Sequence, residues 1–241
     1  MIDLHSHILP GLDDGARSFD DSREIAAAAV AEGVTAIAAT PHVRGDYPTR
    51  AARMEFGVSE LRRFLQAERI DLAVLHGAEI EIARLWEIEP DELLRLTLAH
   101  SRRYVLLEMP YRGWPRSLSA ALSLLRGRGL TAIIAHPERN PEVQDRPDRL
   151  AAVVRDGALV QITSASLDGR LGRAAKATSH RLLELGLAHL LASDAHGPHV
   201  RDVGLAAAVS EVGDEALARF LTVDAPAAIV AGEPLPPLPQ P

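Results

Sequence analysis

Met1-Ile-Asp-Leu-His-Ser-His7 opens the chain with a short apolar strand that runs directly into two histidines. Side chains alternate along an extended strand, so His5 and His7 are expected to project from the same face. Two imidazoles that converge at a strand end form half of a metal site. The spacing therefore predicts a metal centre, provided that other strands bring further His, Asp or Glu side chains to the same place.

Short apolar runs alternate with amphipathic helical segments along the chain. Seven runs are predicted as strands, at residues 2–4, 34–40, 72–75, 104–107, 130–135, 158–163 and 188–192. Helices are expected at about 18–32, 49–68, 89–100, 118–128, 147–156 and 171–185, and after the last strand as far as Gly232. This alternation favours repeated βα units around a parallel sheet. We therefore expect one α/β domain, residues 1–232, followed by a Pro-rich disordered tail, residues 233–241.

The composition removes several classes of function. The chain has no cysteine, which excludes disulfides, thiolate metal ligands and a cysteine nucleophile. The net charge of −7 argues against general binding to nucleic acid, which needs a basic surface. The sequence shows neither a signal peptide nor an apolar run long enough for a membrane helix. We expect a soluble cytoplasmic protein without direct membrane insertion.

Six of the seven predicted strands end in a side chain that can bind a metal ion. The carboxyl ends of the strands meet at the active site in parallel α/β barrels, so the fold itself brings such positions together. The candidate ligands are His5, His7, Asp14, His42, Glu79, Glu108, His136, Asp194 and His196, with Asp13 as an alternative to Asp14. This set is too large for one zinc ion and suits two or three ions that share carboxylates. Such clusters are typical of phosphoester hydrolysis.

Other polar and aromatic residues are interpreted by their distance from these ligands. Arg139 and Arg201 follow His136 and Asp194 closely and are expected to grip phosphate oxygens, the alternative being solvated loop arginines. His76 is interpreted as a packing or supporting residue. Four further histidines are interpreted as structural or solvated: His100, His180, His189 and His199. Three aromatic residues either flank an aromatic phosphoester or pack within their loops: Tyr47, Tyr111 and Trp114.

The motifs together resemble the PHP (polymerase and histidinol phosphatase) superfamily. They are His5-x-His7, Thr40-Pro-His42, Gly77-x-Glu79, Glu108, His136-Pro-Glu-Arg139 and Ser193-Asp-Ala-His196. The opening MIDLHSHILPGLDDGARS, with TPH and AHPERN, is most similar to the bacterial protein-tyrosine phosphatase branch, the CpsB/CapC-type enzymes of capsule and exopolysaccharide synthesis. The resemblance extends to about residue 205. Gln161-Ile-Thr-Ser-Ala-Ser166 departs from the Val-Asn-Ala expected there, so substrate contacts at this position are expected to differ.

The resemblance implies a distorted TIM-like (β/α)7 PHP barrel with a trinuclear metal site. The implied sets are His5, His7, Glu79 and Asp194 for one ion, Glu79, Glu108 and His136 for a second, and Asp14, His42 and His196 for a third. Manganese is the expected metal, with iron and zinc as alternatives. Hydrolysis is expected to proceed by attack of a metal-bridging hydroxide on phosphorus, with Arg139 and Arg201 stabilising the transition state. The implied substrate is a phosphotyrosine protein, a bacterial tyrosine autokinase of polysaccharide export, and the branch also suggests a homo-oligomer.

Three alternatives accompany this interpretation. A small-molecule phosphatase, such as a histidinol-phosphate phosphatase, belongs to the same superfamily. A nuclease is disfavoured, because the chain is acidic and carries no polymerase domain. A metal-binding interaction module without catalytic activity is disfavoured as well, because the ligand set is complete and both arginines are present.

Overall fold

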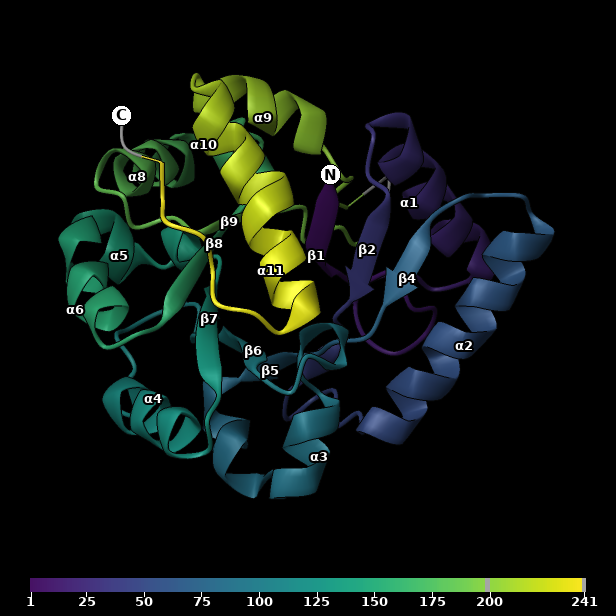
Figure 1. The fold of residues 1–241 in the computed structure, drawn as a ribbon, viewed down its shortest axis with the longest axis horizontal. Helices are drawn as coiled ribbons and strands as arrows, with labels where there is room; N and C mark the ends of the chain where they lie inside the picture. The colour runs from purple at the N-terminus through teal and green to yellow at the C-terminus, as the bar shows by residue number, and fades with distance from the viewer. Residues whose placement is uncertain (198–199, 240–241) are drawn as a thin grey trace.

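The computed structural model describes residues 1–197 and 200–239, which form a single α/β domain with parallel sheets (Figure 1). The strands are β1 Ile2–Ser6, β2 Ala36–Ala39, β3 His42–Val43, β4 Ala73–Leu75, β5 Glu79–Glu81, β6 Tyr104–Glu108, β7 Thr131–Ala135, β8 Leu159–Thr163 and β9 Leu190–Ala192. The α-helices are α1 Phe19–Ala31, α2 Ala51–Ala67, α3 Pro90–Arg95, α4 Leu118–Gly127, α5 Pro141–Asp145, α6 Leu150–Arg155, α7 Ser164–Leu167, α8 Arg173–Glu184, α9 Leu205–Val212, α10 Glu215–Arg219 and α11 Ala225–Ala231. Short 3₁₀ turns span Ile82–Glu87, Leu98–His100, Pro137–Arg139 and Pro147–Arg149, and a π-helical turn spans Phe220–Asp224.

The strands pair in two parallel sheets, in the orders β1-β2-β4 and β3-β5-β6-β7-β8-β9. The two predicted strands 34–40 and 72–75 are each followed, after a short break, by a strand that belongs to the other sheet. At these breaks each hydrogen bond continues the pairing of a single sheet: the amide of Thr40, after β2, donates to Ser6 O of β1 (2.8 Å), and the amide of Glu79 in β5 donates to Pro41 O, just before β3 (3.2 Å). The observed architecture is thus two linked parallel sheets, where the sequence predicted seven strands of one barrel.

The first and last strands lie side by side at their carboxyl ends. The amide of Asp194 donates to His5 O and the amide of His7 donates to Ala195 O, each at 2.8 Å. The buried carboxylate of Asp3 strengthens this junction, because it accepts hydrogen bonds from the amide (3.0 Å) and the hydroxyl (2.5 Å) of Ser193. The chain therefore joins its two most distant strands at the point where the predicted ligands cluster.

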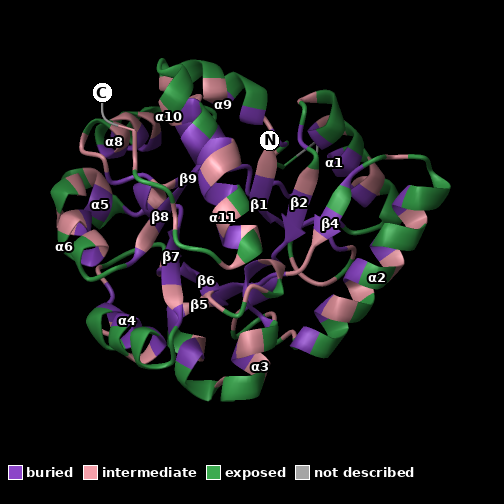
Figure 2. Cartoon of the chain, viewed as in Figure 1, coloured by how far each residue is buried: buried purple, intermediate pink, exposed green. Residues whose placement is uncertain are grey.

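Most helices surround the strands and bury one face against them, so that strands are buried and outer helix faces are exposed (Figures 1 and 2). Helix α2 shows the pattern, since Met54, Val58, Leu61 and Leu65 recur every three or four residues and are all buried. Burial of each such side chain contributes about 1.5–3 kcal/mol. Helix α1 begins where Ser18 accepts a hydrogen bond from the amide of Asp21, a typical N-cap.

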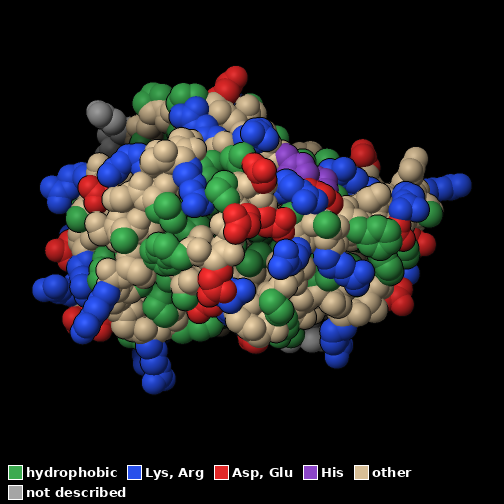
Figure 3. Space-filling view, turned by 90° about the horizontal axis from the view of Figure 1, so that it is seen from below, with side chains coloured by type: hydrophobic (Ala, Val, Ile, Leu, Met, Phe, Trp, Pro, Cys, Tyr) green, Lys and Arg blue, Asp and Glu red, His purple; other side chains and the backbone are tan. Residues whose placement is uncertain are grey.

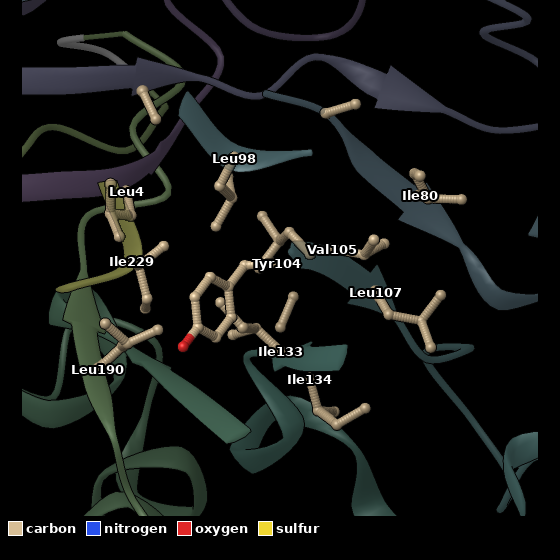
Figure 4. Close-up of a cluster of buried hydrophobic side chains, with 14 of the residues drawn as sticks. Leu4, Ile80, Leu98, Tyr104, Val105, Leu107, Ile133, Ile134, Leu190 and Ile229 are labelled. Atoms are coloured by element: carbon tan, nitrogen blue, oxygen red, sulfur yellow. The ribbon is translucent and has the colours of Figure 1, made fainter. Parts of the chain in front are cut away.

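Helix α11 covers the amino ends of the strands. Ile229 of this helix lies in one apolar cluster with Leu4, Leu190 and Tyr104 (Figure 4). Just beyond the helix, Glu233 O accepts a hydrogen bond from the hydroxyl of Tyr104, at the start of β6. The amino ends are therefore filled by apolar packing, and the carboxyl ends are left to carry the functional side chains.

The helix predicted over 89–100 ends earlier than expected. Helix α3 stops at Arg95, and Ala99 and His100 have left-handed φ angles of 53° and 54°. The amide of Ala99 instead donates to His76 O at 2.6 Å, a long-range contact that local periodicity does not reveal. The short helices α5 and α7 were not predicted, because segments of four or five residues are too short to show helical periodicity.

The Pro-rich segment predicted to be a disordered tail, residues 233–241, is described as far as residue 239. Leu235 and Leu238 are partly buried against the hydrophobic core. Within residues 1–197 and 200–239, no helix is both long and apolar enough to cross a membrane.

Candidate metal centre

The nine predicted ligands lie together, seven of them near or beyond the carboxyl end of a strand and two at the start of a short strand. They come from β1 and its following loop (His5, His7, Asp14), from the first residues of β3 and β5 (His42, Glu79), from the end of β6 (Glu108) and from the segments after β7 and β9 (His136, Asp194, His196). All except Asp14 are buried. Their ligand atoms form four overlapping groups of three or four, and the atoms of each group lie within 4.8 Å of one another. The fold therefore collects residues that are up to 191 positions apart in the sequence.

His5, His7 and Asp194 form the first group. His5 Nε2 is 3.3 Å from His7 Nε2, and Asp194 Oδ1 is 3.3 Å from the former atom and 3.2 Å from the latter. Two ligand atoms that each lie about 2.1 Å from the same ion are about 3.0 Å apart when the ligand–metal–ligand angle is a right angle. They are about 3.4 Å apart when that angle is tetrahedral. The observed separations are thus those of three ligands around a single ion.

Glu79 lies at the centre of the cluster and belongs to two groups. Its Oε2 is 3.3 Å from His5 Nε2 and 3.0 Å from His42 Nδ1, while its Oε1 is 2.7 Å from His136 Nε2. Glu108 lies on the side of His42, with its Oε2 3.8 Å from His42 Nδ1. One oxygen of Glu79 therefore lies against His42 and the other against His136, which belong to different ligand groups, and this is the geometry of a bridging carboxylate.

Asp14 closes the cluster on the solvent side. Its Oδ1 lies 3.4 Å from both His42 Nε2 and His196 Nε2, and His7 completes this group. Compared with the sets implied by the family resemblance, His136 here groups with His5 and Glu79, and Glu108 groups with His42 and Glu79.

Several buried atoms of the cluster fit a metal ion better than a hydrogen-bond network. Among the described residues, Glu79 Oε2, Glu108 Oε1 and Asp194 Oδ1 are buried without a hydrogen-bond donor. A buried carboxylate oxygen left without a donor is costly, and bound cations remove that cost. Imidazole and carboxylate ligands without thiolate suit Zn, Mn or Fe. The residues present therefore fit a cluster of divalent ions.

The carboxylates also repel one another. Burial, reinforced by the negative charge of Glu79, raises the pKa of Glu108 to about 7. Burial likewise disfavours ionised Asp194, but the charges of His5 and Arg201 outweigh it and hold the pKa of Asp194 well below its ordinary value. Positive charge at the centre is thus what keeps closely spaced carboxylates ionised.

Two residues outside the predicted ligand set hold the histidine rings in place. Asp13 Oδ2 lies 2.7 Å from His7 Nδ1 and accepts the amide of His42 at 3.0 Å. Gln161 Oε1 lies 2.9 Å from His5 Nδ1. Each contact leaves the other ring nitrogen, Nε2, directed at the cluster, as supporting residues of metal sites do. Asp13 was considered as an alternative ligand; its position beside His7 is that of an orienting residue.

Two residues at the centre have an unusual backbone conformation, and a third lies unusually close to a neighbouring segment. His136 and Asp194 adopt left-handed φ angles of 34° and 53°, which non-glycine residues rarely do outside special sites. Gly15 lies so close to β1 that a Cβ atom would be 2.3 Å from His7 Cβ and His7 O. A side chain at position 15 would therefore displace His7, so glycine is required there.

Three arginines lie at the edge of the cluster. Arg139 Nη1 donates to Asp194 Oδ2 at 2.8 Å, and Arg201 Nη2 lies 3.2 Å from the same oxygen. Arg44, which the sequence analysis did not select, lies near a different candidate ligand, with Nη1 3.9 Å from Glu108 Oε2. Both predicted arginines are therefore adjacent to the candidate ligand Asp194, and a third arginine lies near the candidate ligand Glu108.

The remaining histidines that the structure describes lie apart from the cluster. His76 and His100 stack on each other with ring centroids 4.1 Å apart, and His180 lies 3.8 Å from the carboxylate of Glu211. His189 accepts the amide of Val160 through Nδ1 at 3.2 Å. His199 lies outside the described residues.

The surface shown in Figure 3 mixes acidic and basic side chains. Lys and Arg side chains are interspersed with Asp and Glu side chains over this face. Such a mixture does not provide the basic stripe that nucleic-acid binding requires.

Comparison with known proteins gives a consistent set of matches. Residues 1–230 match the family model for capsular polysaccharide synthesis, CpsB/CapC. The tyrosine-protein phosphatase YwqE of Bacillus subtilis is 43% identical over 204 residues, covering 84% of this chain and 80% of that protein. The putative tyrosine-protein phosphatase CapC of Staphylococcus aureus is 34% identical over 197 residues, covering 81% of this chain and 77% of that protein.

A solved structure is similar over the whole chain. It comes from a crystallographic study of YwqE from Bacillus subtilis and CpsB from Streptococcus pneumoniae, described as unique metal-dependent tyrosine phosphatases. It superposes with a TM-score of 0.90 at 39% identity and covers 100% of both chains. The match therefore includes every element that carries a candidate ligand.

Proposed function

The chain belongs to the CpsB/CapC family of capsular polysaccharide synthesis, and on that premise we propose that it is a metal-dependent protein-tyrosine phosphatase. The observation that carries the proposal is the convergence of nine imidazole and carboxylate side chains in one cluster, with arginines at its edge. The chain has no cysteine, so the phosphocysteine route of thiolate phosphatases is excluded. A metal cluster with neighbouring arginines is suited to phosphoester hydrolysis.

We propose that the cluster holds two or three divalent ions, with manganese as the first choice and iron or zinc as alternatives. Glu79 is the bridging ligand, because its Oε2 lies beside His42 and its Oε1 beside His136, and these two histidines belong to different groups. When bound, such ions polarise phosphoryl oxygens and lower the pKa of a coordinated water. In the same proposal the two linked sheets correspond to the distorted (β/α)7 barrel of the PHP superfamily, and the domain extends to residue 232.

The side chains of this protein have distinct roles in the proposed reaction. Arg139 and Arg201 bind the phosphoryl oxygens and balance the charge that builds up on them, which is why both lie against Asp194 at the edge of the cluster. Asp13 and Gln161 fix the rings of His7 and His5 and so keep the ligand geometry. A phenolate leaves readily, so protonation of the leaving group by a side chain is not required.

The proposed substrate is phosphotyrosine on a tyrosine autokinase of capsule or exopolysaccharide synthesis. The family's link to capsular polysaccharide synthesis and the tyrosine-phosphatase names of its relatives support this assignment. An autokinase is phosphorylated where ATP is available, so we place the reaction in the cytoplasm. The expectation of a homo-oligomer stays a prediction.

The test compares hydrolysis of a tyrosine-phosphorylated peptide with hydrolysis of histidinol phosphate. Each substrate is assayed with manganese, with chelator, and with His136→Ala, whose imidazole lies 2.7 Å from the central Glu79. We expect manganese-dependent peptide hydrolysis that chelator abolishes and His136→Ala reduces at least a hundredfold. A preference for histidinol phosphate would indicate a small-molecule phosphatase. Metal binding without hydrolysis of either ester would contradict both assignments and favour a non-catalytic binding role.

A further inference from the structure

We infer that Tyr111 is the specificity-determining residue that contacts the aromatic ring of the substrate; this rests on the proposed function. Tyr111 lies in the loop after β6, three residues beyond the candidate ligand Glu108, and it is 51% exposed. An aromatic side chain that stays half exposed beside a polar centre offers a flat apolar surface to a ligand.

The ring of Tyr111 lies next to the guanidinium group of Arg139, a proposed phosphate-binding side chain. The guanidinium carbon of Arg139 lies 5.5 Å from the centroid of the Tyr111 ring, a cation–π distance. The same guanidinium donates to Asp194 at the metal centre. Tyr111, His136 and Arg139 also line one small hollow. A phosphoryl group held by Arg139 would therefore have its ester substituent next to Tyr111.

The loop that carries Tyr111 is anchored on both sides of this residue. Asn140 Nδ2 donates to Pro110 O at 2.8 Å and to Gly113 O at 3.1 Å. Asn140 is buried, and its Oδ1 accepts the amide of Glu142 at the start of α5. The ring is thus presented by a fixed backbone, which reduces the entropy lost when a ligand packs against it.

Tyr47, the other aromatic residue close to a ligand, is less suited to this role. Its ring stacks on the imidazole of His42, with centroids 5.9 Å apart and an interplanar angle of 16°. The guanidinium of Arg44 lies 5.3 Å from the same ring. Tyr47 is therefore engaged by protein side chains near the cluster, whereas Tyr111 keeps half of its surface exposed.

The experiment separates contact with the ring from contact with the phosphoryl group. Calorimetry measures the binding of phenylphosphonate and methylphosphonate to manganese-loaded wild-type protein, Tyr111→Ala and Tyr111→Phe. Phe56→Ala is the matched control, since Phe56 is a 55% exposed aromatic residue on α2. Steady-state kinetics with a tyrosine-phosphorylated peptide accompany the binding data.

We expect Tyr111→Ala to weaken phenylphosphonate binding by about 3- to 10-fold, the range of an aromatic pair, and to leave methylphosphonate binding unchanged. KM for the peptide should rise by a similar factor, and Tyr111→Phe and Phe56→Ala should behave as wild type. Equal loss of both phosphonates, or no loss of either, would overturn the role of Tyr111. Failure of the proposed function has a different signature, namely no peptide hydrolysis by the wild-type protein, whatever the phosphonate affinities.

Discussion

The two ends of the strands are built from opposite kinds of side chain, although the same strands supply both. Toward the amino ends, Leu4 and Tyr104 pack in an apolar cluster with Ile229 of α11. At the carboxyl ends, the next residue of β1 is the buried His5, and β6 ends in the buried Glu108. One end therefore gains stability from apolar burial, while the other buries polar groups whose cost has to be offset.

This contrast indicates that stability and chemistry are separated along each strand. A substitution at the amino ends should change the free energy of unfolding and leave the activity of the folded protein intact. A substitution near the ligands should do the reverse, because the orphaned carboxylate oxygens of Glu79, Glu108 and Asp194 contribute little to the stability of the metal-free chain. Three changes test this division, in order of decreasing expected effect.

Ile229→Ala should lower the free energy of unfolding by about 3 kcal/mol, because it leaves a cavity in a fully buried apolar cluster. Chemical denaturation monitored by circular dichroism measures this effect. The kcat and KM of the folded variant should match those of the wild type. A large change in kcat at temperatures where the variant is fully folded would show that α11 is coupled to the metal centre. It would contradict the proposed separation of stability and chemistry along the strands.

Asp13→Asn should reduce kcat/KM by about 10- to 100-fold, which corresponds to roughly 1.4–2.7 kcal/mol of transition-state stabilisation. The amide is of similar size but loses the charge that fixes Nδ1 of His7. The affinity for manganese should fall as well, while the free energy of unfolding of the metal-free protein should change little. Full activity with unchanged metal affinity would contradict the role of Asp13 in orienting His7.

Substitution of His189 should produce the smallest effect, a change in how the free energy of unfolding depends on pH. Burial lowers its pKa to about 4, so the unfolded state, with an ordinary histidine pKa near 6.5, binds the proton more tightly. The stability from keeping this imidazole neutral is fully present above pH 6.5 and is lost as the pH falls from 6.5 toward 4. Between pH 8 and pH 5, His189→Gln should therefore lose less stability than the wild type, by on the order of 1 kcal/mol. Denaturation curves at the two pH values measure the difference, and parallel losses in both proteins would contradict it.

The sequence predicted the α/β class and the positions of the candidate ligands because both depend on local patterns. His5, Glu108 and His136 follow apolar runs whose lengths and spacing indicate parallel strands, and the fold places such strand ends together. Asp14 was favoured over Asp13 as the ligand, and Asp14 is the one that lies within a candidate ligand group.

What the sequence did not predict depends on contacts between distant segments. The division of 34–40 and 72–75 from the short strands β3 and β5 reflects strand pairing, because β2 pairs with β4 in one sheet and β3 pairs with β5 in the other, which no run of side chains encodes. The role of Gln161 depends on β8 approaching His5 across 156 residues. The left-handed backbone of His136 likewise has no local signal such as glycine.

The junction between β1 and the segment after β9 has a consequence for the synthesis of the chain. Asp3 accepts hydrogen bonds from Ser193, 190 residues later, and the candidate ligands His5 and Asp194 are brought together by the same junction. A chain emerging from the ribosome therefore lacks a complete metal centre until nearly all of the domain has been made. Contacts of such sequence separation form slowly, because a long loop has to be closed first. We expect the nascent protein to be inactive toward phosphoesters. Activity should arise only after β1 has associated with β9 and the segment that follows it.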